Sequence, residues 1–277
     1  MRQIKHILFP IDFSVRCCNA VPFVEAMARR YSAKVTLLGV VEPFYYAMGD
    51  PGVAVVVNSE ELLEDLNARL DASFSRVFAG LCVEKVAALG DPAKVIVDFA
   101  HANGVDLIMM PTHGYGPFRR LLLGSVTAKV LHDAKCPVWT LAHTEERPTL
   151  SQAACHDILC AVDGTPESAS LIKWAGEFSK TAGAPLRLVH VVPAAKPHPE
   201  LPDDTRDSIE RLEGSVGLNA PICVPAGNVA EAICQEARRH DANLVVIGRG
   251  AIHGSLGRLR THAHAIIRES PCPVLSV

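Results

Sequence analysis

The feature that most limits how this chain can fold is an internal repeat. Residues 156–163 (HDILCAVD) repeat residues 6–12 (HILFPID), and the tripeptide Cys-Pro-Val occurs at both 136–138 and 272–274. The copies lie about 140 residues apart, which is far longer than one solenoid unit and indicates two copies of one domain. A chain of 277 residues is long enough for both. We therefore predict a first domain over residues 1–143, a linker over 144–155 and a second domain over 156–277.

Within each copy, short apolar runs alternate with segments of helical periodicity. The apolar runs are nearly continuous, which is typical of parallel strands buried on both faces. Ser14 and Asp91 are suited to cap helices, and Pro22 predicts a kink or a break in the first helix. The predicted fold class is α/β, with two tandem doubly wound parallel sheets of five strands each, a Rossmann-like architecture. In the first copy we expect strands at 4–9, 35–41, 81–89, 105–110 and 137–141, and helices at 15–31, 60–78, 92–100 and 124–134.

Three features fall where the strands of such a sheet end. Asp12 follows the first strand, Val40 lies near the end of the second, and a turn at 111–114 follows the fourth. Ligands of doubly wound sheets bind at the carboxyl ends of the strands. The turn leads to Gly124 and Ser125 at a predicted helix start, where free N–H groups and the helix dipole favour an anion and Ser125 suits the N-cap. An ordinary loop with a helix cap would explain the turn alone, but the three spacings together favour a nucleotide site.

Composition and charge argue against other classes. The net charge is −3, so there is no strongly basic surface for nucleic acid or membrane. The nine cysteines lack paired CxxC spacing and indicate reduced thiols, so we expect a cytoplasmic protein with no disulfide framework and no zinc site. No apolar run approaches the roughly 18 residues that would span a bilayer. A GxxxxGK[ST] loop and a carboxylate cluster for two magnesium ions are missing, so we do not expect fast catalysis.

The motifs at these strand ends resemble those of the universal stress protein family in its tandem, two-domain form. They are Pro-Ile-Asp-Phe-Ser at 10–14, Thr-His-Gly at 112–114 with Gly-Ser at 124–125, and Cys-Pro-Val at 136–138. ATP-binding members of the family carry the pattern G-x2-G-x9-G-S/T. Gly114, Gly124 and Ser125 fit that pattern, whereas Pro111 stands at its first glycine and removes one N–H. The resemblance covers nearly the whole chain and implies an adenine nucleotide α-hydrolase-like fold.

The resemblance also implies a role for each part of the first-copy site. Asp12 would meet the adenine beside Ile11 and Val40, and the residues around Gly114 would lie under the ribose and phosphates. The helix start would bind the phosphates through N–H groups and hydroxyls, and His113 would reach a phosphate or serve as an ordinary loop histidine. The expected ligand is ATP, with AMP and ADP as alternatives. Mg²⁺ is a further option as a companion of the nucleotide. The predicted site comprises Pro10, Ile11, Asp12, Val40, Met110, Pro111, His113, Gly114, Gly124, Ser125, Val126 and Thr127.

The second copy keeps little of this pattern. Asp163, Val191 and Gly248 are retained, but Ala251 stands at the second glycine, and Arg260 or Thr261 at the third. A Cβ atom at these positions opposes close approach of the backbone to a phosphate. We therefore predict a degenerate second site that binds ATP weakly or not at all, although nearby arginines (Arg249, Arg258 and Arg260) could hold an anion differently. His262 and His264 would point to different faces of a helix, which argues against a metal site there.

Our leading hypothesis is a nucleotide-dependent stress-response or signalling module that binds ATP in its first domain. The alternative is a nucleotide-independent scaffold or interaction protein of the same fold. Slow ATP hydrolysis, or transfer of an adenylyl or phosphoryl group, is a third option. We expect the two copies to pack as a pseudo-dimer through residues 137–141 and 273–277. A homodimer is a further option, and the sequence identifies neither a protein partner nor the role of the long connection at 42–58.

Overall fold

The computed structural model describes residues 4–42, 59–74, 78–113, 123–141, 148–193, 202–249 and 258–277. The long connection at 43–58, Gly114 and Ala251 lie outside these ranges, as do the side chains of Arg258, Arg260 and Thr261. The first half contains β1 (His6–Ile11), α1 (Val15–Tyr31), β2 (Lys34–Val41), α2 (Ser59–Phe74), β3 (Val83–Leu89), α3 (Pro92–Ala102), β4 (Leu107–Pro111), α4 (Ser125–Asp133) and β5 (Val138–Leu141). A short helix, α5 (Leu150–Ala153), lies within the predicted linker.

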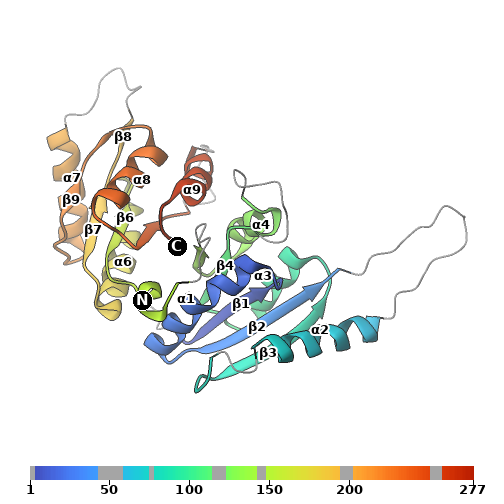
Figure 1. Ribbon diagram of the computed structural model, residues 1–277. Coiled ribbons are helices and arrows are strands. Elements are labelled where there is room, and N and C mark those ends of the chain that lie inside the picture. Colours follow the sequence, from blue (N-terminus) through green and yellow to red (C-terminus); the bar gives the residue numbers. More distant parts are fainter. Residues whose placement is uncertain are drawn as a thin grey trace, which may run out of the picture.

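The second half repeats this order of elements with shorter strands. It contains β6 (Ile158–Ala161), α6 (Ser168–Ala182), β7 (Leu186–Val189), β8 (Val192–Pro193), α7 (Pro202–Ser215), β9 (Ile222–Cys223), β10 (Ala226–Gly227), α8 (Val229–Arg239), β11 (Leu244–Ile247), α9 (Arg258–Glu269) and β12 (Val274–Ser276). In Figure 1 the blue-to-green first half and the yellow-to-red second half lie side by side.

Ten of the twelve described strands form one continuous sheet, in the order β3-β2-β1-β4-β5-β12-β11-β6-β7-β9, while β8 and β10 pair separately as a small parallel sheet. Each half contributes five strands that pair in parallel, and the second half mirrors the order of the first. The halves meet where β5 and β12 pair antiparallel, with Trp139 opposite Leu275. The predicted doubly wound α/β fold and the pairing through the last strands are therefore confirmed.

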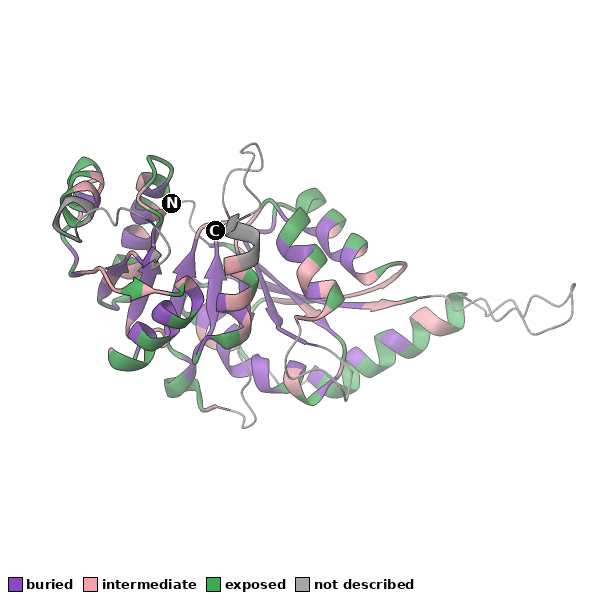
Figure 2. Ribbon diagram, turned by 90° about the horizontal axis from the view of Figure 1, so that it is seen from above, coloured by how far each residue is buried: buried purple, intermediate pink, exposed green. Residues whose placement is uncertain are grey.

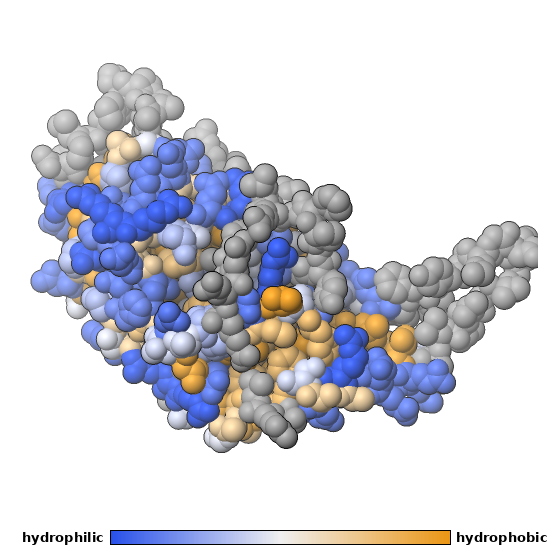
Figure 3. Space-filling view, viewed as in Figure 1, coloured by the Kyte–Doolittle hydropathy of each residue, from blue (hydrophilic) through white to orange (hydrophobic). Residues whose placement is uncertain are grey.

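Helices cover both faces of this sheet. One hydrophobic cluster lies under α1, α2, α6 and α7, and a second lies under α3, α4, α8 and α9. Figure 2 shows the buried strands running between the helices, whose outer faces are exposed. On the face shown in Figure 3 the second half is mostly hydrophilic, whereas apolar residues gather over the first half. None of the helices in the described part of the chain combines the length and the apolar character needed to cross a membrane.

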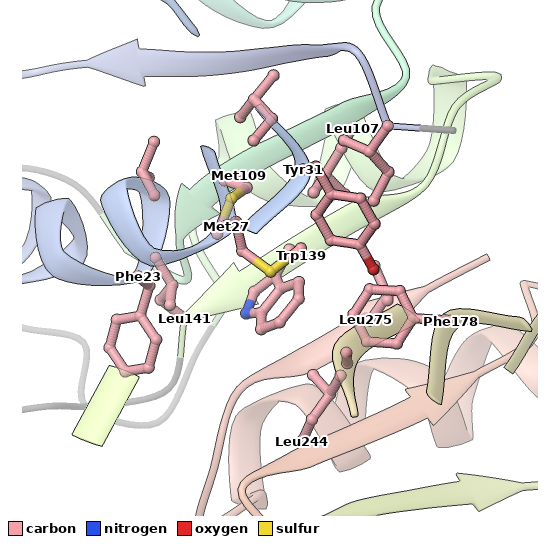
Figure 4. Close-up of a cluster of buried hydrophobic side chains, with 14 of the residues drawn as sticks. Phe23, Met27, Tyr31, Leu107, Met109, Trp139, Leu141, Phe178, Leu244 and Leu275 are labelled. Carbon is pink, nitrogen blue, oxygen red and sulfur yellow. The ribbon is translucent and has the colours of Figure 1, made fainter. Parts of the chain in front are cut away.

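Aromatic side chains from both halves share one core at the junction (Figure 4). Phe178 of α6 is fully buried, and its ring centroid lies 6.1 Å from that of Tyr31 and 6.1 Å from that of Trp139. Trp174, one helical turn earlier, stacks on the same ring at 5.2 Å. Burying one such ring contributes on the order of 2–3 kcal/mol. The halves are therefore joined by side-chain packing as well as by the strand pair.

Local sequence signals explain where the first-half helices begin. Ser14 caps α1 by accepting a hydrogen bond from the Cys17 N–H at 3.1 Å. Asp91 caps α3 by accepting from the Lys94 N–H at 2.9 Å, and Pro92 occupies the first helical turn. Both caps were predicted. They place the two helix starts directly after the carboxyl ends of β1 and β3, on the rim where the predicted site lies.

The predicted break at Pro22 is not observed, because α1 runs unbroken from Val15 to Tyr31. A proline inside a helix costs about 3 kcal/mol through its missing N–H and its ring. Ten residues of α1 are buried, Pro22 among them, and the helix is capped at both ends. This burial and capping offset the local penalty.

Candidate functional site

A cavity of about 460 Å³ opens at the carboxyl ends of the first-half strands. Every predicted site residue that the structure describes lines it, and only Gly114 falls outside the described residues. These residues come from the ends of β1, β2 and β4 and from the start of α4, so the fold brings together segments more than 100 positions apart in the sequence. The lining residues are Pro10, Ile11, Asp12, Leu38, Val40, Pro92, Ile96, Met110, Pro111, His113, Gly124, Ser125, Val126 and Thr127.

The end of the cavity nearest β1 combines one exposed carboxylate with apolar walls. Asp12 is exposed, and its Oδ1 accepts a hydrogen bond from the Ser14 N–H at 2.9 Å, which fixes the carboxylate against the start of α1. Ile11 is buried beside it, and Val40 is half-buried on the neighbouring strand. This pairing of an acceptor with apolar surfaces suits a flat, partly polar ring.

Three lining residues were missed by the sequence reasoning. Leu38 lies two positions before Val40 on β2, so the period-two alternation of a strand could have identified it. Pro92 begins α3, and Ile96 lies one helical turn further along. Helix starts that follow strand ends surround such sites, so the cap at Asp91 was the available signal for these two residues.

The opposite end of the cavity is built from the end of β4 and the start of α4. The Gly124 N–H donates to the Thr112 carbonyl at 2.9 Å, which folds the returning chain back onto the strand end. A Cβ atom at Gly124 would lie 3.2 Å from the Thr112 carbonyl oxygen and 3.4 Å from the His113 Cα. A side chain at this position would therefore be crowded by the backbone that ends β4.

The predicted N-cap at Ser125 is wrong by one residue. Gly124 is the N-cap of α4 and has no side chain to cap it, while Ser125 is the first helical residue and is exposed. The first turn of α4 also carries no acidic residue. An uncapped helix start exposes backbone N–H groups at the positive end of the helix dipole, which favours an anion.

The Thr127 hydroxyl and the His113 imidazole, both at this end of the cavity, already have partners within the protein. Thr127 Oγ1 donates to the Pro111 carbonyl at 3.1 Å, so its hydroxyl proton is engaged and Thr127 offers its backbone N–H instead. His113 is 5% exposed, and its Nδ1 lies 3.1 Å from the Thr112 hydroxyl. Pro111 continues β4 in register with Leu141, so the residue at the family's first glycine position serves here as a strand residue.

The second half has a larger cavity, of about 700 Å³, at the matching strand ends. It is lined by the retained Asp163, Val191 and Gly248, together with His190, Trp174 and other residues. His262 also lines it, whereas His264 on the same helix is exposed, as expected for two histidines on different helix faces.

Asp163 is held more tightly than Asp12. Its Oδ1 accepts from the Thr165 N–H at 3.1 Å, the Thr165 hydroxyl at 2.7 Å and the Ser168 hydroxyl at 2.6 Å. Partial burial opposes ionisation, but these hydrogen bonds hold the pKa of Asp163 below its ordinary value. The carboxylate is therefore satisfied by its own loop.

Arg249 occupies the position that corresponds to Thr112 in the first half. Its Nη1 donates to the Ala134 carbonyl at 2.6 Å, and its Nη2 donates to the Cys136 carbonyl at 2.8 Å. Both carbonyls belong to the connection between α4 and β5 of the first half. Burial lowers the pKa of Arg249 from its ordinary value. Arg249 also lines the second-half cavity, but its guanidinium is hydrogen-bonded to the first half and so links the two halves.

The fold and the two strand-end cavities define a tandem Rossmann-like α/β protein. A model described as the universal stress protein family matches residues 3–141 and 155–277. The chain therefore belongs to the universal stress protein family and carries two family domains in tandem.

Individual relatives agree with this assignment. A universal stress protein of Mycolicibacterium smegmatis is 25% identical over 298 residues, covering 98% of this chain and 96% of its own. One from Methanocaldococcus jannaschii is 30% identical over 151 residues, covering 48% of this chain and 92% of its own. The crystal structure of a universal stress protein from Archaeoglobus fulgidus aligns with 99% of this chain and 96% of its own at a TM-score of 0.74. At 20% identity, that last likeness shows the shared fold.

Proposed function

We propose that this universal stress protein is an ATP-binding signalling module and that the nucleotide binds in the first-half cavity. The observation that carries the proposal is the convergence of three unlike surfaces on one cavity of about 460 Å³. They are the Asp12 carboxylate, the apolar walls from β1 and β2, and the uncapped start of α4. The volume lies within the range of about 300–1,000 Å³ typical of small-molecule sites.

Each surface matches one part of an adenine nucleotide. The Asp12 carboxylate can accept a hydrogen bond from the exocyclic amine of adenine, which guanine does not present at that position. Ile11, Leu38 and Val40 offer apolar contact to a purine face. The phosphates then extend toward Gly124 and the N–H groups of Ser125 and Val126, where the helix dipole favours their charge. Mg²⁺ would accompany the phosphates through their own oxygens.

The signalling part of the proposal depends on a difference in affinity between two conformational states. A nucleotide shifts the protein toward the state that binds it better, and only by the ratio of the two affinities. The segment between β4 and α4 starts and ends beside the cavity, because Pro111 and Gly124 line it and Gly124 is hydrogen-bonded to Thr112. A phosphate held at the start of α4 would therefore lie next to both ends of this segment. A partner would sense the ligand at the described ends of this segment, where Gly124 bonds to Thr112.

Calorimetric titration of the intact protein with ATP, ADP, AMP and GTP, with and without Mg²⁺, tests the proposal. We expect ATP to bind, GTP to bind at least about tenfold more weakly because Asp12 selects the amine, and AMP to lose the phosphate contacts. Failure of every adenine nucleotide to bind would contradict the proposal and favour a nucleotide-independent scaffold. Steady turnover of ATP would point instead to an enzyme on the same fold.

A further inference from the structure

We propose that the second half carries a zinc site formed by Cys223, Glu236 and His240. Cys223 lies on β9, the edge strand of the sheet, while Glu236 and His240 lie at the end of α8 (Figure 1). Among the described residues, one atom from each of the three side chains lies within 4.8 Å of the other two. This cluster is separate from both strand-end cavities and does not depend on the proposed nucleotide function.

The separations between the side-chain atoms match those around a tetrahedral zinc ion. Bonds of about 2.3 Å to sulfur and about 2.0–2.1 Å to nitrogen and oxygen place a sulfur and a nitrogen ligand about 3.5 Å apart, and a nitrogen and an oxygen ligand about 3.3 Å apart. Cys223 Sγ lies 3.8 Å from His240 Nε2, and His240 Nε2 lies 3.3 Å from Glu236 Oε2. Small side-chain movements would therefore complete the coordination.

The ligand types suit Zn²⁺ better than a hard cation. A thiolate and an imidazole favour zinc over magnesium or calcium, and three protein ligands leave the fourth position for water. Cys223 and His240 are each partly exposed, which gives an ion a path to the cluster. Glu236 lies in the last turn of α8 and His240 is the residue that follows the helix as its C-cap, so the end of α8 brings the two side chains together.

A buried carboxylate provides independent support. Glu236 is only 8% exposed, and its Oε2 accepts no hydrogen bond within the described part of the chain. Its other oxygen, Oε1, lies 3.5 Å from Arg239 Nη1, but that arginine side chain is 73% exposed and therefore a weak partner. The neighbours of Oε2 are the other two proposed ligands, with His240 Nε2 at 3.3 Å, and a bound cation would neutralise the charge of this buried carboxylate.

Binding would displace one proton. Zinc binds a cysteine as its thiolate, so the Cys223 thiol must give up its proton when the ion binds. Zinc binding breaks the S–H bond, forms the Zn–S bond and releases the proton to the buffer. The resulting link would tie the two-residue edge strand β9 to α8 and stabilise the second half.

The test uses the full chain, stripped of metal with a chelator and titrated with Co²⁺ as a spectroscopic probe and then with Zn²⁺. We expect one saturable site per chain with a thiolate-to-cobalt charge-transfer band. Cys223→Ser should abolish the band, and Glu236→Gln and His240→Gln should each weaken Zn²⁺ binding at least about tenfold. Cys82→Ser and His156→Gln alter an exposed thiol and an exposed imidazole outside the cluster, and should change neither result.

A second readout separates loss of the site from loss of the fold. Zinc that binds only the folded state should raise the melting temperature of the intact protein by several degrees, and at the same zinc concentration should raise that of Glu236→Gln clearly less. Circular dichroism and ATP titration of each variant report whether both halves are folded. The proposal is overturned if the intact protein has no saturable metal site, or if Cys223→Ser keeps the band and the affinity.

Discussion

The two halves of this protein share one chain path but differ at the strand ends where a ligand would bind. In the first half, Gly124 folds tightly against the Thr112 carbonyl and leaves the start of α4 uncapped. In the second half, the position of Thr112 is taken by Arg249, whose guanidinium is engaged by carbonyl groups of the first half. The helix start at the first strand end is thus open, whereas Arg249 makes the second strand end part of the contact between the halves.

The two aspartates at the strand ends, Asp12 and Asp163, also differ in how many hydrogen bonds their carboxylates accept. Asp12 is exposed, with one Oδ1 contact from the Ser14 backbone, whereas Asp163 Oδ1 accepts three hydrogen bonds from its own loop. The second cavity is larger, at about 700 Å³ against about 460 Å³, so size does not decide which cavity fits a nucleotide. Under the proposed function, the placement of hydrogen-bonding groups and backbone would decide which cavity binds the nucleotide.

The largest expected effect comes from filling the close backbone approach in the first half. Gly124→Val should weaken ATP binding about 100-fold or more, because its side chain would crowd the Thr112 carbonyl and displace the phosphate-binding N–H groups. Titration calorimetry measures the loss. Gly248→Val, at a glycine that lines the second-half cavity, should leave ATP affinity unchanged, and an equal loss from both would show that the halves do not differ as described.

The next effect is on stability and comes from the residue that joins the halves. Arg249→Met removes the donors to the Ala134 and Cys136 carbonyls, and should lower the free energy of unfolding by about 2 kcal/mol. Denaturant unfolding measures this change, with the exposed Lys180→Met as the control for loss of a surface cation. Unchanged stability would mean that Arg249 does not bridge the halves in solution, and a loss of ATP binding without unfolding would place its charge at the ligand.

A smaller effect is expected from the adenine-facing carboxylate. Asp12→Asn keeps the shape of the side chain but adds a donor group, and should weaken ATP binding about tenfold while narrowing the preference for ATP over GTP. Competition titrations with both nucleotides measure the ratio. Asp163→Asn is the matched change in the second half and should not alter it. A preference unaffected by Asp12→Asn would show that another group selects the base.

The smallest effect concerns pH and the loop that holds Asp163. A carboxyl group whose pKa is lower in the folded than in the unfolded chain stabilises the fold above its unfolded pKa of about 3.9, and this stabilisation is lost as the pH falls through the folded value. Ser168→Ala removes one hydrogen bond that lowers the pKa of Asp163. It should reduce stability near neutral pH by under about 1 kcal/mol, because solvent screens a half-exposed carboxylate.

Unfolding of Ser168→Ala and of the intact protein over a range of pH measures this effect. The difference between them should shrink as the medium becomes acidic. Ser170→Ala, an exposed hydroxyl on the same helix, is the control and should show no such trend. A difference that stays constant with pH would mean that the hydrogen bond does not act through the charge of Asp163.

Much of the fold and of the first site could be predicted because the signals are local or repeated. The duplication, the caps at Ser14 and Asp91, and the strand ends at Asp12 and Val40 all follow from short sequence patterns. Leu38 was missed because the alternation of β2 was not followed back from Val40. Ser125 was misplaced by one residue because a glycine can take the N-cap when the returning backbone already bonds to the strand end.

Other features depend on contacts that no local pattern encodes. The reach of Arg249 into the first half requires the antiparallel pairing of β5 and β12 to bring the two connections together. The absence of paired cysteines in the sequence predicted no zinc site. Cys223 on β9 instead lies near Glu236 and His240 at the end of α8. The sequence shows only that Glu236 and His240 are four residues apart, and it does not show that Cys223 lies beside them.

If one half binds a nucleotide and the other does not, the number of ATP molecules bound per chain will show the difference. Equilibrium dialysis of the intact protein with labelled ATP should saturate at one nucleotide per chain. That single site should be lost in Gly124→Val and kept in Gly248→Val. Saturation at two per chain, or one nucleotide that persists in Gly124→Val, would contradict the account.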